Sequence, residues 1–301
     1  MRGKEYYYSK FPESLFAAEN PKAFSKSVVK GYDACSGLKV VICGLCRDVE
    51  TILPATISRI EKIRSFFSNS QVIILENDST DNTPSIIKAY ERKSSGVKSI
   101  TPIVKDKKKY SNQFAETGMS FGRMALMSNL RNIYLDELHD YKNFDYVIMI
   151  DMDLLGGWSY EGFLSCFAHK KWSAMGSNGL LFKEDTAIKN GSIWHKKTKR
   201  LFFDTWAFRE LGQDKFKGYV LHESLYLEKG EEPVEVNSVF SGLGIYRIQD
   251  VLQCEYRPFS SFENPVCEHV SFHEQIRSNG GKVYINPSMI TLYSPTEYTP
   301  S

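Results

Sequence analysis

Short hydrophobic runs alternate with amphipathic segments along the first half of the chain. The runs at 38–44, 71–75 and 146–150 are rich in Val and Ile, which is typical of buried parallel strands. The segments 52–63 and 122–139 carry apolar residues at helical spacing. This order of elements predicts an α/β fold with a doubly wound mixed sheet flanked by helices, in which ligands gather at the carboxyl ends of the strands.

The most apolar of these runs ends at the triplet Asp151-Met152-Asp153. In a continuing strand the two carboxylates would face opposite ways, so the chain must turn here for both to reach one ion. Carboxylate oxygens suit Mg²⁺ or Mn²⁺, and such an ion neutralises the charge of a diphosphate. A triplet of this kind is also common in solvated turns, and its place after a buried strand favours the metal site. Asp153 is the better candidate ligand of the two.

The overall charge argues against two classes of partner. Lys and Arg number 38 and Asp and Glu 36, so a net charge of +2 favours neither nucleic acid nor an anionic membrane surface. The six cysteines lack the spacing of a disulfide framework, and we interpret them as free thiols. The N-terminus has no apolar run long enough for a signal peptide or a transmembrane helix. We therefore expect a cytoplasmic chain, or a Golgi-luminal one if an N-terminal anchor was removed.

Three strand ends together resemble the GT-A glycosyltransferase superfamily. They are Val40-Val41-Ile42-Cys43 with Arg47, the cluster Glu76-Asn77-Asp78-Ser79-Thr80-Asp81, and the acidic triplet. The resemblance covers residues 38–160 and implies a nucleoside-diphosphate-sugar donor with Mn²⁺ or Mg²⁺ as cofactor. It assigns the base and ribose of the donor to Gly44, Leu45, Arg47 and Glu76, with Asp78 or Asp81 nearby. We expect Asp151 to reach the ribose or a metal-bound water. The alternative for the second cluster is local, with Ser79 or Asp81 capping the following helix.

Two arginines stand eight residues apart on the helix predicted before the acidic triplet. Arg123 and Arg131 would therefore lie near one face of that helix. Arginine on a helix surface is usually solvated or ion-paired. The resemblance implies instead that a basic side chain here contacts the diphosphate or orients the acidic triplet, which makes both residues donor-binding candidates.

The stretch from Cys267 to His273 offers a second set of chemical groups. His269 and His273 stand four residues apart, a spacing that shares one helix face, and Glu268 precedes them. The resemblance implies that Glu268 is the base that deprotonates the acceptor hydroxyl and that His273 or His269 is a further metal ligand. The alternative is structural, with Glu268 stabilising a helix N-terminus. A zinc hydrolase fits less well, because the residue order differs from His-Glu-x-x-His.

Aromatic residues beside polar ones indicate a surface for sugar rings in the second half of the chain. Asp204, also a catalytic candidate, and Trp206 are the acceptor-site candidates, and Trp158 offers a further aromatic face, although buried tryptophan is more often core. The segments 203–206 and 177–180 also resemble the fungal capsule-associated mannosyltransferases of the same superfamily. We interpret the basic run 105–109 as solvated surface.

These features predict one domain with two lobes behind an N-terminal arm. The arm is 1–37, the nucleotide-sugar-binding lobe is 38–160, and the acceptor-binding and catalytic lobe, with mixed or antiparallel strands, is 161–301. The predicted function is metal-dependent transfer of a hexose from a nucleoside diphosphate to a hydroxyl of a glycan or glycoconjugate. The alternative is a nucleotidyltransferase acting on sugar phosphates, which needs a glycine-rich loop where this chain has only Gly44.

Overall fold

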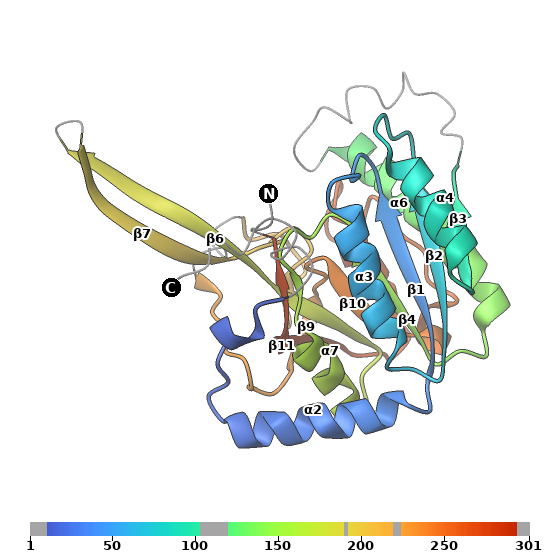
Figure 1. The fold of residues 1–301 in the computed structure, drawn as a ribbon, viewed down its shortest axis with the longest axis horizontal. Helices are drawn as coiled ribbons and strands as arrows, with labels where there is room; N and C mark the ends of the chain where they lie inside the picture. Colours follow the sequence, from blue (N-terminus) through green and yellow to red (C-terminus); the bar gives the residue numbers. More distant parts are fainter. Residues whose placement is uncertain (1–10, 103–119, 190–191, 219–223, 294–301) are drawn as a thin grey trace.

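The described residues form one mixed sheet of 11 strands with helices on both faces, which confirms the predicted α/β fold (Figure 1). The computed structural model describes residues 11–102, 120–189, 192–218 and 224–293, with the backbone alone over 184–189 and 192–198. The basic run 105–109 lies outside the described residues.

The helices and strands have the following bounds. The strands are β1 (Lys39–Cys46), β2 (Asn69–Glu76), β3 (Val97–Ile100), β4 (Tyr146–Asp151), β5 (Gly157–Trp158), β6 (Ala174–Lys189), β7 (Ser192–Phe202), β8 (Arg209–Glu210), β9 (Val234–Ser238), β10 (Leu243–Arg247) and β11 (Val283–Leu292). The α-helices are α2 (Pro21–Cys35), α3 (Leu53–Arg64), α4 (Thr83–Lys93), α6 (Phe121–Glu137), α7 (Tyr160–Ser165), α9 (Ile248–Val251) and α10 (Glu268–Ser278). Short 3-10 helices are η1 (Glu13–Leu15), η2 (Leu138–Tyr141) and η3 (Cys166–Ala168).

Four parallel strands form one half of the sheet, and three of them, β1, β2 and β4, lie at the predicted hydrophobic runs. Their order is β3-β2-β1-β4, so β1 lies between β2 and β4. Leu45 of β1 pairs with Leu75 on one side and with Asp151 on the other. The carboxyl ends of β1, β2 and β4 therefore lie side by side. This brings Arg47, the cluster at 76–81 and the acidic triplet to one edge of the sheet.

The other half of the sheet is mixed, as expected beyond residue 160. Strand β10 runs antiparallel to both β4 and β6, β11 runs parallel to β6, and β9 runs antiparallel to β11. The pairing of Leu243 with Ile150 places the start of β10 beside the end of β4. The hairpin of β6 and β7 extends well beyond the rest of the sheet (Figure 1).

Two hydrophobic cores cover the two faces of the sheet, because successive side chains of a strand point to opposite faces. Val41 and Cys43 of β1 belong to the core that also holds residues of α6 and α10. Val40 and Ile42 belong to the core on the other face, which holds residues of α3, α4 and α7. The helices α6 and α10 thus lie on the same face of the sheet, where both can contribute residues to one site.

The N-terminal region contains a regular helix that its weak periodicity did not indicate. Helix α2 begins after Asn20, whose side-chain oxygen accepts a hydrogen bond from Ala23 N over 3.1 Å, and Pro21 occupies its first turn. At Gly31 a Cβ atom would approach Leu164 O to 1.8 Å, so the absence of a side chain lets α2 pack directly on α7. Phe24, Gly31 and Cys35 are the buried residues of this helix, and their spacing places them on the one face by which α2 packs.

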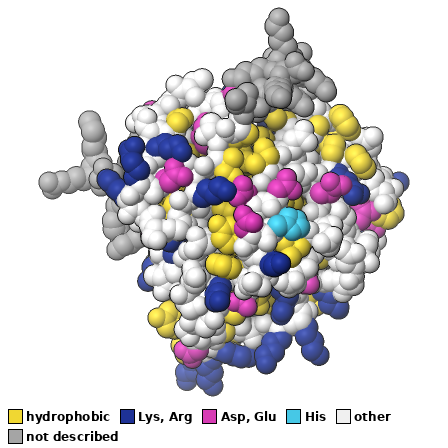
Figure 2. Space-filling model, turned by 90° about the vertical axis from the view of Figure 1, so that its right-hand side faces the viewer, with side chains coloured by type: hydrophobic (Ala, Val, Ile, Leu, Met, Phe, Trp, Pro, Cys, Tyr) yellow, Lys and Arg dark blue, Asp and Glu magenta, His cyan; other side chains and the backbone are white. Residues whose placement is uncertain are grey.

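The surface and the cysteines agree with the composition. None of the described helices is long and apolar enough to cross a membrane. All six cysteines are unpaired and buried, which confirms that they are free thiols. On the face shown in Figure 2, acidic and basic side chains are interspersed among hydrophobic ones over the middle, and Lys and Arg gather along the lower edge. Charges of both signs thus occupy this face, in keeping with the near-neutral chain.

Candidate functional site

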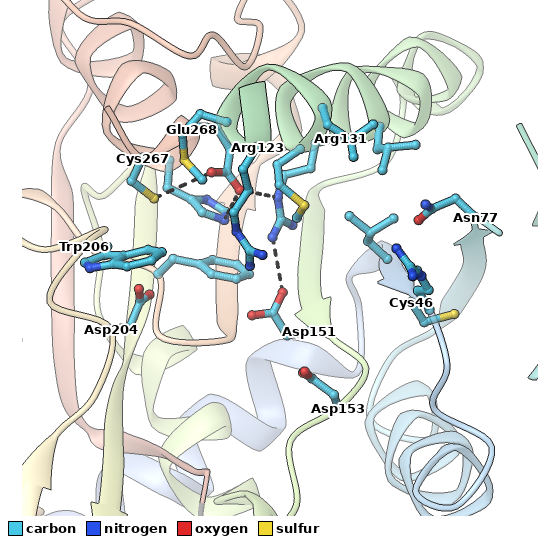
Figure 3. A pocket seen from close by; sticks show the side chains of 18 of the residues that line it. Cys46, Asn77, Arg123, Arg131, Asp151, Asp153, Asp204, Trp206, Cys267 and Glu268 are labelled. Carbon is cyan, nitrogen blue, oxygen red and sulfur yellow. Dashed lines mark hydrogen bonds and ion pairs between the residues drawn. The ribbon is translucent and has the colours of Figure 1, made fainter. Parts of the chain in front are cut away.

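A pocket of about 540 Å³ opens where the carboxyl ends of β1, β2 and β4 meet. The start of α6, the start of α10 and the segment after β7 complete its wall (Figure 3). Its charged and polar lining residues are Arg47, Asp48, Asn77, Arg123, Arg131, Asp151, Asp153, Asp204, Glu268 and His269. The fold therefore brings most of the sequence-predicted site residues into one cavity.

The turn after β4 places both carboxylates of the acidic triplet in the pocket. Asp151 and Asp153 line it, whereas Met152 between them is 1% exposed. Met152 packs over Gly44, where a Cβ atom would approach the sulfur of Met152 to 2.4 Å. Gly44 therefore makes room for the buried residue of the triplet and does not line the pocket, in contrast to the predicted contact with the donor.

Helix α3 fixes the course of this turn from the other side of the sheet. Thr56 Oγ1 donates to Met152 O over 3.0 Å, and Arg59 Nη1 donates to Leu154 O over 2.8 Å. Both side chains are fully buried. Burial lowers the pKa of Arg59 to about 10, which leaves the guanidinium charged at neutral pH. Because hydrogen bonds from a charged donor are strong, the turn that presents the two carboxylates is rigidly held.

Arg131 of α6 joins two of the predicted site residues. Its Nε donates to Glu268 Oε1 over 2.9 Å, and its Nη2 donates to Asp151 Oδ1 over 3.2 Å (Figure 3). Arg131 and Glu268 are each 4% exposed. The guanidinium also lies over the ring of Phe240, 5.1 Å from its centroid. Arg131 is thus ion-paired inside the site, and its two bonds orient the acidic triplet and Glu268 together.

The charge around Asp151 suits a cation. Burial raises the pKa of Asp151 to about 6; the charge of Arg131 opposes this shift, whereas those of Asp153 and Glu268 add to it. Asp153 itself is exposed at the rim of the pocket. A divalent cation between the two carboxylates would relieve their repulsion, and Mg²⁺ in particular binds through one or two carboxylates when phosphate oxygens and water complete its shell. The residues present therefore fit a cation shared with a diphosphate.

The two histidines of α10 occupy different environments. His273 is fully buried, with Nδ1 2.8 Å from Ser238 Oγ and Nε2 3.2 Å from the hydroxyl of Tyr246. Both ring nitrogens have protein partners outside the pocket, which corrects the predicted metal role of His273: the shared helix face packs into the sheet. His269 lines the pocket, but within the described part of the chain no cluster of three His, Cys, Asp or Glu side chains could hold a metal.

Hydrogen bonds lock together the loops after β1 and β2. Asp48 Oδ1 accepts from Thr80 N over 2.7 Å, and Asp81 accepts from both Glu50 N and Thr83 N over 2.9 Å. Thr83 is the first residue of α4, so Asp81 does satisfy a free donor at the start of that helix, as the capping alternative holds. The same contact fixes the loop that carries Arg47 and Asp48 into the pocket.

The polar cluster after β2 contributes a residue other than the predicted ones. Glu76 is buried outside the pocket, where its Oε1 accepts from Ser79 N over 2.8 Å. Asp78, with a φ of 56°, also lies outside the lining. Asn77 lines the pocket instead. Neighbouring residues at a strand end point to opposite sides, so Asn77 faces the pocket while Glu76 and Asp78 do not.

Asp204 lies on the side of the pocket opposite the loop of β1. Its backbone has a φ of 67°, and its Oδ2 accepts from Ser241 N over 2.8 Å. Burial raises the pKa of Asp204 to about 7; the Ser241 bond opposes this shift, and the charges of Asp151 and Glu268 add to it. Asp204 is therefore a carboxyl group that titrates near neutral pH within reach of the ligand space.

Aromatic rings line the same side of the pocket. Trp206 does so as predicted, together with Phe203, Phe240 and Tyr293, which sequence reasoning missed. Phe203 and Tyr293 stack with ring centroids 3.7 Å apart. Each of these three aromatic residues follows a strand-like run or adjoins a residue already named as a candidate. That position alone did not distinguish a pocket residue from a core residue. Trp158 is 1% exposed and outside the lining, so its aromatic face serves the core.

Solved structures of similar fold are distant in sequence. GalNAc-T7 with UDP, GalNAc and Mn²⁺ is 12% identical (TM-score 0.48; 85% of this chain and 44% of that chain covered). The mannosyltransferase PcManGT from Pyrobaculum calidifontis with GDP-Man and Mn²⁺ is 8% identical (0.47; 90% and 65%), and TarS from S. aureus with UDP-GlcNAc is 13% identical (0.47; 85% and 59%). The chain thus spans less than two thirds of the length of each. Among curated proteins there is no significant match.

A family model identifies the chain more directly. The model described as Cryptococcal mannosyltransferase 1 (CAP59_mtransfer) matches residues 39–275. This range includes the acidic triplet, Arg131, Asp204 and Glu268. The match confirms the resemblance to the fungal capsule-associated mannosyltransferases. The chain therefore belongs to the Cryptococcal mannosyltransferase 1 family.

Proposed function

We propose that this chain is a metal-dependent glycosyltransferase that moves a hexose from a nucleoside-diphosphate-sugar donor to a hydroxyl of a glycan or glycoconjugate. The observation that carries the proposal is the convergence of Asp151, Asp153 and Glu268 on one pocket, with Arg131 bonded to Asp151 and to Glu268. Groups for a leaving diphosphate and for an attacking hydroxyl are thus held in one frame. The family description supports the same reaction class and makes mannose the first sugar to test.

The donor is proposed to lie against the loops after β1 and β2. Leu45, Arg47 and Asn77 line this part of the pocket and offer apolar, cationic and amide groups to a nucleoside. Arg123 reaches the pocket from α6 (Figure 3), where a guanidinium suits diphosphate oxygens. Mn²⁺ or Mg²⁺ held by Asp151 and Asp153 would supply, when bound, positive charge for the departing diphosphate.

Glu268 is the proposed base. Arg131 holds its Oε1, and its Oε2 lies 3.7 Å from the weakly bonding thiol of Cys267. Oε2 accepts the proton of the acceptor hydroxyl while the hydroxyl oxygen bonds to the anomeric carbon. The bond from that carbon to the diphosphate oxygen breaks, and the nucleoside diphosphate leaves with the electron pair. This route inverts the anomeric configuration. Asp204 is the second carboxylate proposed for the acceptor side.

The proposed division into lobes follows from the origin of these residues. Leu45, Arg47 and the acidic triplet come from 38–160, whereas Asp204, Trp206 and Glu268 come from 161–301. We therefore retain a donor-binding and an acceptor-binding lobe behind the arm at 1–37 as part of the proposal; the described residues of the arm, 11–37, lie outside the pocket lining.

Product analysis separates this function from that of a nucleotidyltransferase. The protein is incubated with Mn²⁺, a nucleotide sugar (GDP-mannose, then UDP-hexoses) and a panel of methyl glycosides, and in parallel with GTP and mannose 1-phosphate. We expect a disaccharide and a free nucleoside diphosphate in the first reaction. Pyrophosphate and a nucleotide sugar in the second reaction would establish the nucleotidyltransferase instead.

Substitutions tie the activity to the pocket. Asp151→Ala and Asp153→Ala should each abolish transfer while the thermal unfolding transition stays cooperative. Asp140→Ala, at an exposed position of η2, is the matched control and should retain activity. Normal transfer by both pocket variants would contradict the proposal.

A further inference from the structure

His269 is a buried imidazole in the wall of the pocket. It is the second residue of α10, is 2% exposed and lines the cavity beside Glu268. Among the described residues, neither Nδ1 nor Nε2 has a hydrogen-bond partner. A buried polar atom without a hydrogen bond costs about 1–3 kcal/mol. Two such atoms on one ring that borders a cavity indicate that a ligand completes their hydrogen bonds.

The ring of His269 is held in a fixed orientation. It stacks on Phe240, with ring centroids 3.7 Å apart and an interplanar angle of 14°. Tyr256 packs against it edge to face, at 5.3 Å and 89°. The two nitrogens are therefore positioned before any ligand arrives, and little side-chain entropy is lost when one binds.

The environment of His269 selects a neutral ligand group. Burial lowers the pKa of His269 well below its usual range, and the nearby charge of Arg131 lowers it further. The neutral ring has one donor nitrogen and one acceptor nitrogen. A sugar hydroxyl, which both donates and accepts, matches this pair better than a diphosphate, which only accepts.

The position of His269 beside the carboxylate of Glu268, the proposed base, favours the acceptor sugar as its ligand. Its Nε2 lies 3.8 Å from Glu268 Oε1. A molecule that presents a hydroxyl to Glu268 therefore has a second, neighbouring group within reach of the imidazole. Phe240 and Trp206, also in the lining, offer apolar faces to the C–H groups of the same ring.

We propose that His269 determines acceptor specificity by binding the hydroxyl next to the one that Glu268 deprotonates, so that the pocket selects acceptors with two adjacent ring hydroxyls. This inference rests on the proposed function. A site built to bond a substrate hydroxyl rejects an analogue that lacks it, because the buried polar group is then left unpaired. The wild-type protein should therefore discriminate strongly against one particular deoxy sugar.

The test compares His269→Ala and His269→Asn with the wild-type protein. Transfer is measured at saturating donor and Mn²⁺ to methyl α-mannoside, methyl α-glucoside and methyl β-galactoside, and to monodeoxy analogues of the glycoside used. His269→Ala should lower the acceptor kcat/KM about 10- to 100-fold and abolish discrimination against one deoxy analogue. The Mn²⁺ concentration for half-maximal rate and the hydrolysis of the donor by water should not change. His269→Asn should recover part of the loss, because an amide also donates and accepts.

His273→Asn is the matched control, since His273 lies on the same helix but outside the pocket. It should lower the unfolding temperature and leave the acceptor kcat/KM unchanged. His269→Asn and His269→Gln keep a polar group, so the test stands if the alanine variant fails to fold.

Three results would overturn the inference. A rise in the Mn²⁺ requirement of the His269 variants would make His269 a metal ligand. An equal loss of donor hydrolysis and of transfer would show that it positions Glu268. Unchanged acceptor kcat/KM would show that it has no role in binding. Failure of the wild-type protein to transfer sugar to any glycoside would contradict the proposed function itself. This outcome is distinguishable from failure of the inference about His269, in which the wild-type protein is active.

Discussion

Arg131 and Glu268, 137 residues apart in the sequence, form a buried ion pair in which Nε donates to Oε1 over 2.9 Å. The same guanidinium bonds Asp151 at the end of β4. Burying charges is costly, and proteins retain such pairs when their geometry is well satisfied. The pair therefore connects the two halves of the pocket, one that holds the acidic triplet and one that holds the proposed base.

Removing the guanidinium should both destabilise and inactivate the protein. Arg131→Met leaves Glu268 buried without its partner, so the free energy of unfolding should fall by about 3–5 kcal/mol and transfer should be lost. Arg131→Lys keeps the charge but cannot reproduce the two bonds of the planar fork, so it should recover stability more than activity. Urea unfolding and kcat/KM measure the two effects.

The control for Arg131 is Lys88→Met, which removes an exposed pair with Glu91 on α4. Exposed ion pairs contribute little to stability, so this variant should have the unfolding free energy and the activity of the wild type. An Arg131→Met variant that unfolds at the same urea concentration as the control would contradict the structural role of the pair.

Glu268 can be tested by an isosteric change. Glu268→Gln keeps an oxygen for Arg131 but cannot accept the proton, so kcat should fall about 10²- to 10⁴-fold. Binding of the nucleoside diphosphate, which we place on the other side of the pocket, should be unchanged. Calorimetry with the nucleotide and steady-state kinetics check both parts, and a variant with normal kcat would exclude Glu268 as the base.

Two glycines with the same backbone conformation isolate the packing of the turn after the acidic triplet. Gly157 and Gly212 both have a φ of 75°. At Gly157 a Cβ atom would lie 2.6 Å from the guanidinium carbon of Arg59, whereas at Gly212 no atom lies within 4 Å. Gly212→Ala should cost about 1–2 kcal/mol for the left-handed backbone alone, and Gly157→Ala about 1–3 kcal/mol more. Equal unfolding temperatures for the two variants would contradict the role assigned to Arg59.

The hydrophobic pattern predicted the parallel half of the sheet because buried strands carry a local signal. The runs at 38–44, 71–75 and 146–150 match β1, β2 and β4 to within two residues at each end, and α10 begins at Glu268. Helix α2 was not predicted, because two of its three buried positions, Gly31 and Cys35, carry a weak hydrophobic signal although they share one helix face with Phe24. The order of the strands beyond β4 depends on contacts between distant segments, which periodicity does not encode.

The candidate site was predictable in its residue types and less so in its contacts. The triplet and Glu268 belong to the pocket because strand ends and a helix start converge there. Glu76 was chosen over Asn77, since the side of a strand end to which each residue points depends on the local turn. Both His269 and His273 were predicted to be metal ligands. His269 lines the pocket, whereas His273, one helical turn later, lies in the core. The pairing of Arg131 with Glu268 joins residues that no local pattern relates.

The pH dependence of stability tests the environment of Asp204. Its pKa is raised from an ordinary value of 3.8 to about 7, so between these values the folded protein binds more protons here than the unfolded chain. The stability present at pH 4 is therefore lost as the pH rises to about 7. Asp204→Asn removes this dependence. As the pH rises from 4 to about 7, the free energy of unfolding of the variant should increase by about 2–4 kcal/mol relative to that of the wild type. Chemical unfolding in EDTA at each pH measures the difference, and parallel curves would refute it.

The central claim is that Asp151 and Asp153 hold a divalent cation together with the diphosphate of the donor. Calorimetric titration of the wild-type protein and of Asp153→Ala with GDP and with UDP, each with Mn²⁺ and with EDTA, tests it directly. We predict that one nucleotide binds the wild-type protein in Mn²⁺, that EDTA abolishes the binding, and that Asp153→Ala binds at least tenfold more weakly, a loss of about 1.4 kcal/mol or more. Binding of equal strength with EDTA, or by Asp153→Ala, would contradict the claim.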